Sequence, residues 1–247
     1  MSNPQPLEEM RCMQEAYDMS RAHLALTPCV IKAREGSEKD LVSLEHMFQQ
    51  LGFESGLKRD PTAQQFQEEM GKFQQTIDAR EGFVSCAFVV LMAHGEEGYL
   101  KGTDGQVVEL ENLFRVLNSK NCQALRAKPK AYIVQACRGE QRDPGETVGG
   151  DNVEMITEDS HQTIPTHTDT LHIYSTAEGY LPYRHDEEGS YFIQTLVDMF
   201  TNKKGPILEL LTEVTRRMAE GERIQEGEAR KVNPEVESTL RKQLYLQ

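Results

Sequence analysis

Two residues that could cleave a peptide bond each follow a short apolar run. Cys137 comes just after the run 131–134, and a turn at 138–139 follows it at once. His94 follows the apolar run 86–92 in the same way. Because parallel strands present their carboxyl ends at one edge of a sheet, the two side chains can meet although they lie far apart in the chain. A thiol beside an imidazole is the minimal pair for nucleophilic attack with acid–base assistance.

Each member of this pair needs the other. A free thiol is mostly protonated near neutral pH, so Cys137 attacks an amide quickly only with a partner. His94, with an ordinary pKa near ~6.5, suits delivery of a proton to the leaving amine. A lone cysteine after a strand is ordinarily core packing, and we expect that role for those without such a context, namely Cys12, Cys29, Cys86 and Cys122.

Several motifs together point to a known family. The run Gln135–Gly139, with a His-Gly pair upstream, is identified as the caspase signature. Residues 175–180, Arg184 and 189–192 are similar to the small-subunit signature of that family, and 126–151 is most like its branch linked to epidermal differentiation. The resemblance implies an α/β fold of three layers, with a mostly parallel central sheet flanked by helices. It also implies a cysteine endopeptidase that cuts after aspartate.

The resemblance assigns substrate selection to three residues. In caspases two arginines and a glutamine clamp the aspartate side chain, and Arg34, Arg184 and Gln135 occupy the matching positions. A forked guanidinium matches a carboxylate through two hydrogen bonds. Without the resemblance, each arginine would be read as a surface residue and the glutamine as ordinary strand-end hydrogen bonding.

Other parts of the site follow from the same likeness. The backbone amides of Gly95 and Cys137 are expected to form the oxyanion hole, because glycine lets the backbone approach closely. Tyr180 and Tyr183 are expected to line the neighbouring substrate pockets. The chain departs from the family pattern in having no tryptophan, and in having Ala93 where serine is usual. Preference beyond the aspartate therefore does not follow from the family.

Composition excludes several classes of function. The chain has 247 residues and a formal net charge of −13, which argues against binding nucleic acid or an anionic membrane. No run reaches the ~18 apolar residues of a membrane span, and the polar start with Glu8 and Glu9 is not a secretory signal. Five cysteines without paired spacing indicate a reducing compartment, the cytosol or also the nucleus. We expect no cofactor and no metal, since phosphate-binding glycine motifs and histidine ligand spacings are missing.

Apolar periodicity predicts strands that alternate with helices, which implies a layered α/β sheet. Ser37 is expected to cap one helix, and Thr62 and Gln65 form the pattern of a capping box at the start of another. Residues 222–234 are expected to be a charged loop. The predicted strands are 24–32, 53–58, 86–92, 130–136, 171–176 and 240–246, and the predicted helices are 37–51, 62–77, 109–117, 191–200 and 207–218.

The predicted organisation is one catalytic domain in several parts. Residues 1–22 form a propeptide-like arm, 23–151 the large-subunit region, 138–169 a cleavable linker and 170–247 the small-subunit region. The linker carries eight acidic residues and no apolar period, which is typical of a functional or disordered segment. A solvated loop without regulatory role remains the alternative. The candidate cleavage positions are Asp143, Asp151, Met155, Ile156, Thr157 and Asp159.

The resemblance also implies partners. These are protein substrates with aspartate before the cut bond, an activating protease that processes the zymogen, and a second copy that pairs through the last strand and neighbouring helices. A role in cell differentiation or death would follow. A weakly active or inactive scaffold is the alternative, motivated by the missing tryptophans, although the intact Cys137 and His94 argue against it. A thiol redox sensor is less favoured, because no second cysteine lies close in sequence.

Overall fold

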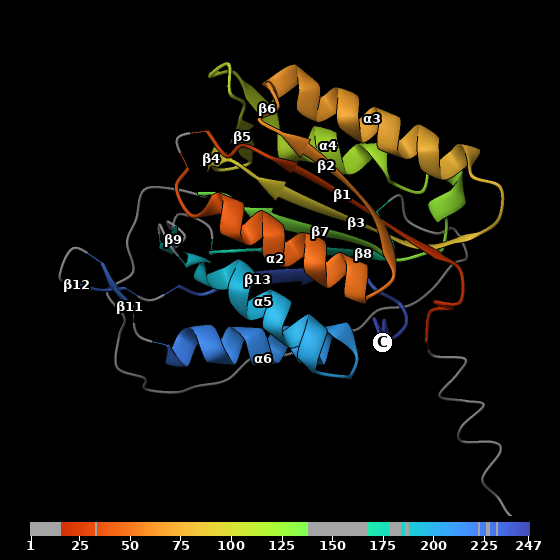
Figure 1. Ribbon diagram of the computed structural model, residues 1–247. Coiled ribbons are helices and arrows are strands. Elements are labelled where there is room, and N and C mark those ends of the chain that lie inside the picture. Colours follow the sequence, from red (N-terminus) through yellow and green to blue (C-terminus); the bar gives the residue numbers. More distant parts are fainter. Residues whose placement is uncertain are drawn as a thin grey trace, which may run out of the picture.

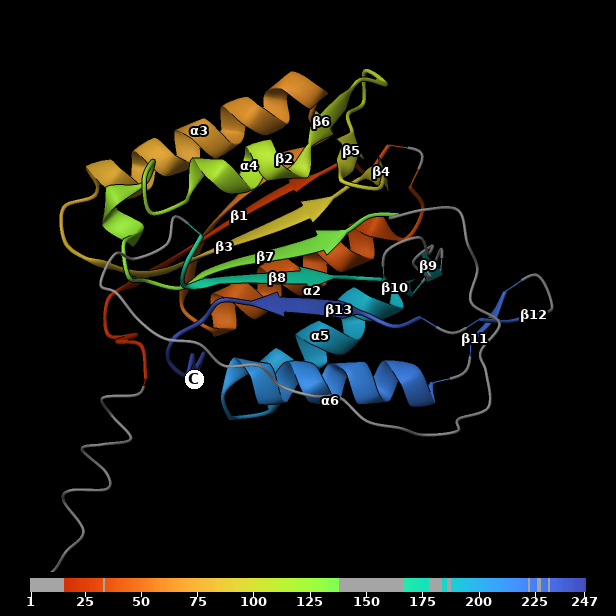
Figure 2. The same cartoon turned by 180° about the vertical axis from the view of Figure 1, so that it is seen from behind.

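A six-stranded sheet forms the centre of the protein (Figures 1 and 2). The computed structural model describes residues 16–32, 34–137, 167–177, 184–185, 188–221, 223–225, 228–230 and 232–247. The strands of the sheet, in spatial order, are β13 (Glu235–Ser238), β8 (Thr170–Tyr174), β7 (Lys130–Gln135), β3 (Val84–Met92), β1 (Ala22–Cys29) and β2 (Phe53–Arg59). All neighbours pair in parallel except β13 and β8. The expected mostly parallel sheet is confirmed.

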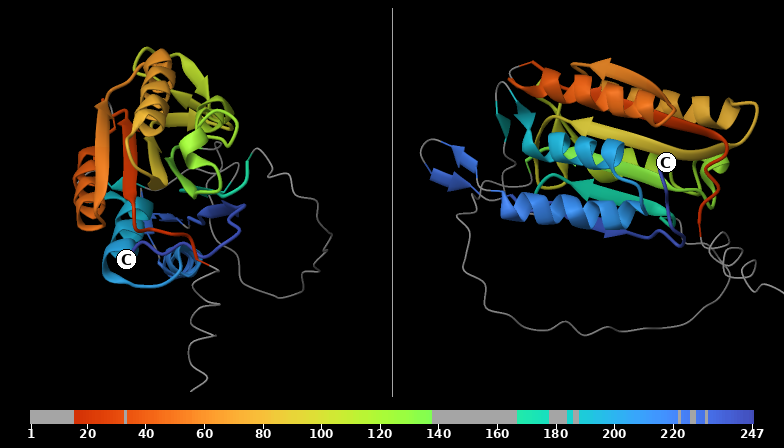
Figure 3. Two further views of the ribbon diagram at one scale, coloured as in Figure 1. Left: turned by 90° about the vertical axis from the view of Figure 1, so that its right-hand side faces the viewer. Right: turned by 60° about the horizontal axis from the view of Figure 1, so that its bottom comes forward.

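Helices cover both faces of the sheet and complete three layers (Figure 3). On one face lie α2 (Ser37–Gln50), α5 (Tyr191–Asn202) and α6 (Ile207–Glu220), and on the other α3 (Ala63–Ala79) and α4 (Leu110–Val116). Successive residues of β3 enter the two cores in turn, with Phe88 and Val90 on the first face and Val89 and Leu91 on the second. Because both faces are buried, the strand is apolar over residues 86–92, as expected. Among the described helices, none is long and apolar enough to cross a membrane.

The starts of two helices differ in how well the sequence predicted them. At α3 the capping box is confirmed, since Thr62 Oγ1 accepts from the Gln65 amide and Gln65 Oε1 accepts from the Thr62 amide. The predicted Ser37 cap of α2 is wrong. Ser37 is already helical, and Gly36 precedes it with a φ of 79°. The Ser37 amide donates to the Arg34 carbonyl, so the turn at Gly36 takes the place of a side-chain cap.

Short antiparallel strands appear that the sequence did not predict. A small sheet follows β3 and consists of β4 (His94–Glu96), β5 (Tyr99–Lys101) and β6 (Val107–Glu109). The charged stretch 222–234 contains a hairpin, β11 (Arg223–Gln225) with β12 (Glu228–Arg230), so its assignment as a loop was wrong. Three residues are too few for apolar alternation to be visible.

The predicted closing strand at 240–246 is also wrong. The edge strand is β13, while the final residues form only isolated bridges, from Gln243 to Ala16 and from Tyr245 to Pro206. Leu244 and Leu246 are buried in the core next to α5 and α6. Their alternation therefore reflects packing of an irregular segment rather than membership of the sheet.

Candidate active site

The carboxyl ends of β3 and β7 bring the histidine and cysteine segments together. Met92 pairs with Gln135 at the last position of the two strands, and the Ala93 amide donates to the Gln135 carbonyl over 3.3 Å. His94 is two residues beyond Met92, and Cys137 is two residues beyond Gln135. Both residues thus lie beyond the carboxyl ends of the paired strands β3 and β7, and His94 is the first residue of β4. The small sheet β4 to β6 lies at this end of the central sheet (Figure 2).

Gly95 shows how close the two segments are. A Cβ atom added at residue 95 would lie 3.1 Å from the Cys137 carbonyl oxygen and 3.0 Å from the Ala136 Cβ. Since real Cβ atoms rarely approach other atoms so closely, only glycine fits without a shift of the backbone. His94 is exposed and Cys137 is half-buried, so a substrate can reach both.

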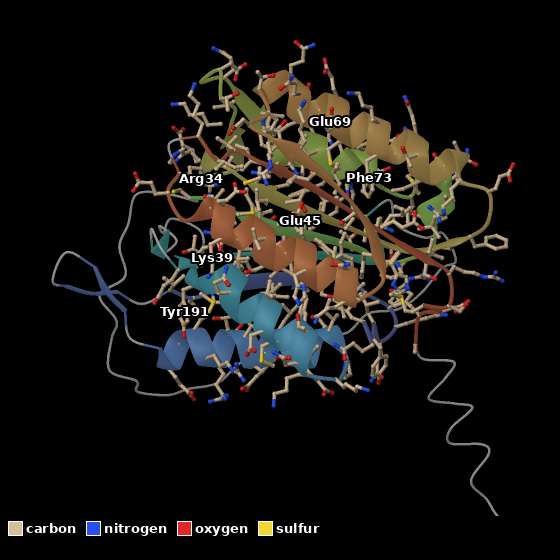
Figure 4. All side chains as sticks on the ribbon, in the orientation of Figure 1. Arg34, Lys39, Glu45, Glu69, Phe73 and Tyr191 are labelled. Carbon is tan, nitrogen blue, oxygen red and sulfur yellow. The ribbon has the colours of Figure 1, made fainter. Side chains whose placement is uncertain are left out.

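Arg34 lies at this edge as a buried residue, not as a surface one. Its side chain is 3% exposed, and Nη1 donates to the Val30 carbonyl at 2.9 Å. Nη2 donates to the Gln135 carbonyl at 3.4 Å, which places the guanidinium next to the strand that leads to Cys137. Figure 4 shows Arg34 near the start of α2, at the same end of the molecule as Tyr191.

The polar side chain of Gln135 is buried without hydrogen-bond partners among the described residues. The residue is 1% exposed, and neither its Oε1 nor its Nε2 has a hydrogen-bond partner among the described residues. An unsatisfied buried amide costs ~1–3 kcal/mol. Its place at the carboxyl end of a strand makes the Gln135 amide a candidate for contact with a ligand.

A buried carboxylate that the sequence did not reveal, Asp40, holds the start of α5 against α2 next to the predicted site. Asp40 of α2 is fully buried and accepts hydrogen bonds from the Ser190 amide at 2.9 Å, from the Ser190 hydroxyl and from Gln194 Nε2 at 2.8 Å. Burial raises the pKa of Asp40, while these hydrogen bonds and the charge of Arg34 oppose the rise. Gly189, with a φ of 84°, leaves room for the carboxylate. An acid in a first helical turn is common, so its sequence position alone gave no signal.

Comparison with known proteins identifies the family. Residues 27–245 match the family described as Caspase domain. The chain belongs to the caspase family. Human Caspase-14 is 73% identical over the full length of both chains, and mouse Caspase-14 is 65% identical over all of this chain and 98% of its own. Bovine Caspase-3 is 33% identical over 94% of this chain and 88% of its own.

A solved structure agrees with the fold of this caspase. The crystal structure of Caspase-1 from Spodoptera frugiperda superposes with a TM-score of 0.80, covering 94% of this chain and 95% of that one at 24% identity. The chain is therefore a cysteine-type endopeptidase of the caspase fold. The likeness to one branch of the family is confirmed by the two Caspase-14 relatives over the whole length of this chain.

Part of the predicted site lies where the structure gives no side-chain description. The backbone of Arg184 belongs to β9 (Arg184–His185), which pairs with β10 (Gly189–Ser190), and Ser190 lies opposite Arg184. Since Ser190 is held by Asp40, that carboxylate anchors the segment that carries Arg184. The predicted residues outside the described part are Tyr180, Tyr183, Asp143, Asp151, Met155, Ile156, Thr157 and Asp159.

The remaining described cysteines of this caspase are not suited to nucleophilic chemistry. Cys29, Cys86 and Cys122 are buried, and burial raises the pKa of Cys29 and of Cys122 to about 12. A buried thiol of raised pKa stays protonated and inert. Cys12 lies outside the described residues. Within the described ranges, no group of three or more histidine, cysteine, aspartate or glutamate residues could hold a metal ion.

Proposed function

We propose that the protein is an active protease that cuts polypeptides after aspartate. The observation that carries this proposal is the buried side-chain amide of Gln135, which lacks a partner among the described residues and belongs to a residue whose backbone carbonyl accepts from the buried guanidinium of Arg34. A substrate carboxylate supplies the charge that the guanidinium favours and accepts a hydrogen bond from the amide nitrogen. An apolar or basic side chain supplies neither, so it is a poor occupant.

The proposed mechanism uses the two neighbouring segments described above. His94 takes the proton of the Cys137 thiol, Sγ attacks the backbone carbonyl carbon of the bound aspartate, and the amides of Gly95 and Cys137 stabilise the resulting oxyanion. Collapse of this intermediate breaks the C–N bond while His94 gives a proton to the departing amine. Water then attacks the thioester while His94 accepts one of its protons, the new carboxylic acid departs, and His94 returns the proton to the sulfur, which restores the thiol.

The test is a comparison of the native protein with Cys137→Ala. We expect an electrophilic probe that carries aspartate to label the native protein covalently, and peptides to be cut after aspartate only. Cys137→Ala should abolish both signals with little change in Tm, because the side chain is half-buried and small. Turnover that survives in Cys137→Ala would refute the assignment. Absence of probe labelling in the native protein would favour a binding scaffold of caspase fold.

We further propose that the protein is made as a zymogen and processed in the segment 138–169 by an activating protease. The acidic sequence of the segment between β7 and β8 supports this, and both flanking strands are held in the sheet by their own neighbours. The five cysteines without paired spacing support a location in the reducing cytosol, with access to the nucleus. The family likeness supports a role in differentiation or death. Cleavage by the proposed protease should raise kcat/KM for aspartate peptides, and an unchanged value would contradict zymogen control.

Assembly into a homodimer is a separate part of the proposal. An edge strand offers unpaired backbone groups to a second copy, and here that strand is β13 rather than the segment 240–246. A second copy would lie antiparallel beside it and extend the sheet. The mass measured by sedimentation tests this, and a monomer at all protein concentrations would contradict it.

A further inference from the structure

A pocket of about 480 Å³ opens beside His94. Its walls come from the end of β1, at Val30 and Lys32, and from the small sheet β4 to β6, at Lys101 and Val107. We call it the His94–Lys101 pocket. The described residues that line it include neither Cys137 nor the substrate-binding residues Arg34 and Gln135, so it is distinct from the aspartate site.

The strand register explains why these side chains share the pocket. Lys101 lies directly opposite His94, and Val107 lies directly opposite Lys101. Residues opposite one another in antiparallel strands point to the same face, so the three side chains form one row across the small sheet. The adjacent row turns the other way, and its members Leu100 and Val108 are buried in the core. The pocket therefore has a fixed wall rather than a chance arrangement of surface side chains.

The chemistry of cleavage decides which part of the substrate reaches this pocket. The aspartate side chain occupies the site of Arg34 and Gln135, and His94 gives its proton to the amine that departs. The residues after the cut are attached to that amine. They must consequently leave the reaction centre past the imidazole, where the His94–Lys101 pocket lies.

The charges of the pocket select among those residues. Lys32 and Lys101 are exposed and cationic, and Glu96 is the acidic member of the wall. Glu96 belongs to the next row outward, opposite Tyr99, so the cation nearest to His94 along the strand pairing is Lys101. The pocket thus combines a local positive excess with the apolar surfaces of Val30 and Val107, within a protein whose net charge is −13.

We propose that the His94–Lys101 pocket binds a carboxylate side chain in one of the first two positions after the scissile bond. The inference rests on the proposed cleavage after aspartate and extends it to the other side of the cut. Substrates of this enzyme then carry an acidic residue on both sides of the cut bond, with the first held by Arg34 and Gln135 and the second by Lys101 and Lys32.

The test uses quenched fluorescent peptides that are identical up to the aspartate and carry Glu, Gln or Lys at one of the two following positions. We expect kcat/KM to fall from Glu to Gln to Lys, by about 2- to 5-fold per step, as for a partly exposed ion pair. Lys101→Gln should bring the Glu-to-Gln ratio close to one, and Lys101→Glu should invert it. Lys120→Gln, which removes an exposed lysine beyond the end of α4, should keep the native ratio. High salt should reduce the preference.

Two further measurements separate the possible failures. An aspartyl coumarin amide has no residue after the cut, so loss of its cleavage would contradict the proposed protease and not the pocket. Binding of the same peptides to Cys137→Ala reads the pocket without turnover, and the Kd values should follow the same order. Equal kcat/KM values for Glu and Lys peptides, equal Kd values for them, or a preference that persists in Lys101→Gln, would each overturn the inference.

Discussion

The backbone of Gly95 lies against that of Cys137, so that a Cβ on residue 95 would approach the Cys137 carbonyl oxygen to 3.1 Å and the Tyr99 carbonyl oxygen to 2.7 Å. Position 95 lies between the proton donor at residue 94 and the strand end that carries the nucleophile. A side chain there would push the two segments apart. The close contact therefore fixes the separation on which attack and proton transfer both depend.

Gly95→Ala should impair catalysis more than folding. Displacement of the residue 95 amide removes one donor to the oxyanion, which typically costs ~10²-fold in kcat, while overpacking at the surface of the sheet costs ~1–3 kcal/mol of stability. The control is Gly71→Ala in α3, where an added Cβ meets no atom within 4 Å. That variant should gain ~0.5–1 kcal/mol and keep the native rate. Equal kcat values for the two variants would contradict the role of Gly95.

Gln135→Met separates substrate binding from stability. Methionine has a similar shape and no unsatisfied polar atoms, so the free energy of unfolding should stay constant or rise by ~1 kcal/mol. Loss of the amide should lower kcat/KM for aspartate peptides by ~10-fold or more, mainly through KM. Urea unfolding and steady-state kinetics measure the two effects. A less stable protein with native kinetics would mean that the amide is satisfied within the fold.

The central sheet and the catalytic motif could be predicted because both depend on local sequence. The run 86–92 is apolar on every residue, which only a strand buried on both faces or a core helix requires, and its length decides for a strand. Cys137 and His94 then follow from the positions of strand ends. The sequence pattern is clear at these positions because the buried strand and the catalytic residue that follows it are consecutive in the chain.

Other features could not be predicted because they depend on partners far away in the chain. Asp40 is held by Ser190, which lies 150 positions away, and no local pattern encodes that pair. The His94–Lys101 pocket needs the register of strands three residues long. The edge strand was misplaced because Leu244 and Leu246 alternate as a strand would, although they are buried by helices.

Asp169, the last residue of the predicted linker and the one directly before β8, is expected to be an important stabilising residue. Its buried carboxylate accepts from the Tyr17 hydroxyl at 2.7 Å and from Arg241 Nε and Nη2 at 2.9 and 2.8 Å, and so joins three distant segments. Its φ is 57°, which asparagine also tolerates. Asp169→Asn therefore removes the charge without backbone strain and should cost ~2–3 kcal/mol, less than for a fully buried pair because Arg241 is half-exposed.

The controls for Asp169 follow from its partners. Tyr17→Phe removes one hydrogen bond and should cost ~1 kcal/mol. Because the cluster lies beyond the segment 138–166 and is built from its own contacts, Asp169→Asn should destabilise the uncut and the linker-cleaved protein equally. Chemical unfolding of both forms measures this. A loss confined to one form would show that the linker contributes to the cluster.

His172 should make the protein sensitive to mild acid. The imidazole stacks on Tyr132 at 5.3 Å and contacts Phe114 at 4.5 Å, and burial lowers its pKa to about 4. The unfolded chain then binds a proton near pH 6.5 that the folded protein does not, so stability falls as pH drops from about 6.5 to 4, by ~3 kcal/mol from this residue. His172→Phe keeps the ring packing and removes the titration. Below pH 6 the native protein should therefore lose unfolding free energy relative to His172→Phe. A difference between the two proteins that stays constant from pH 7.5 to 4 would contradict the assignment.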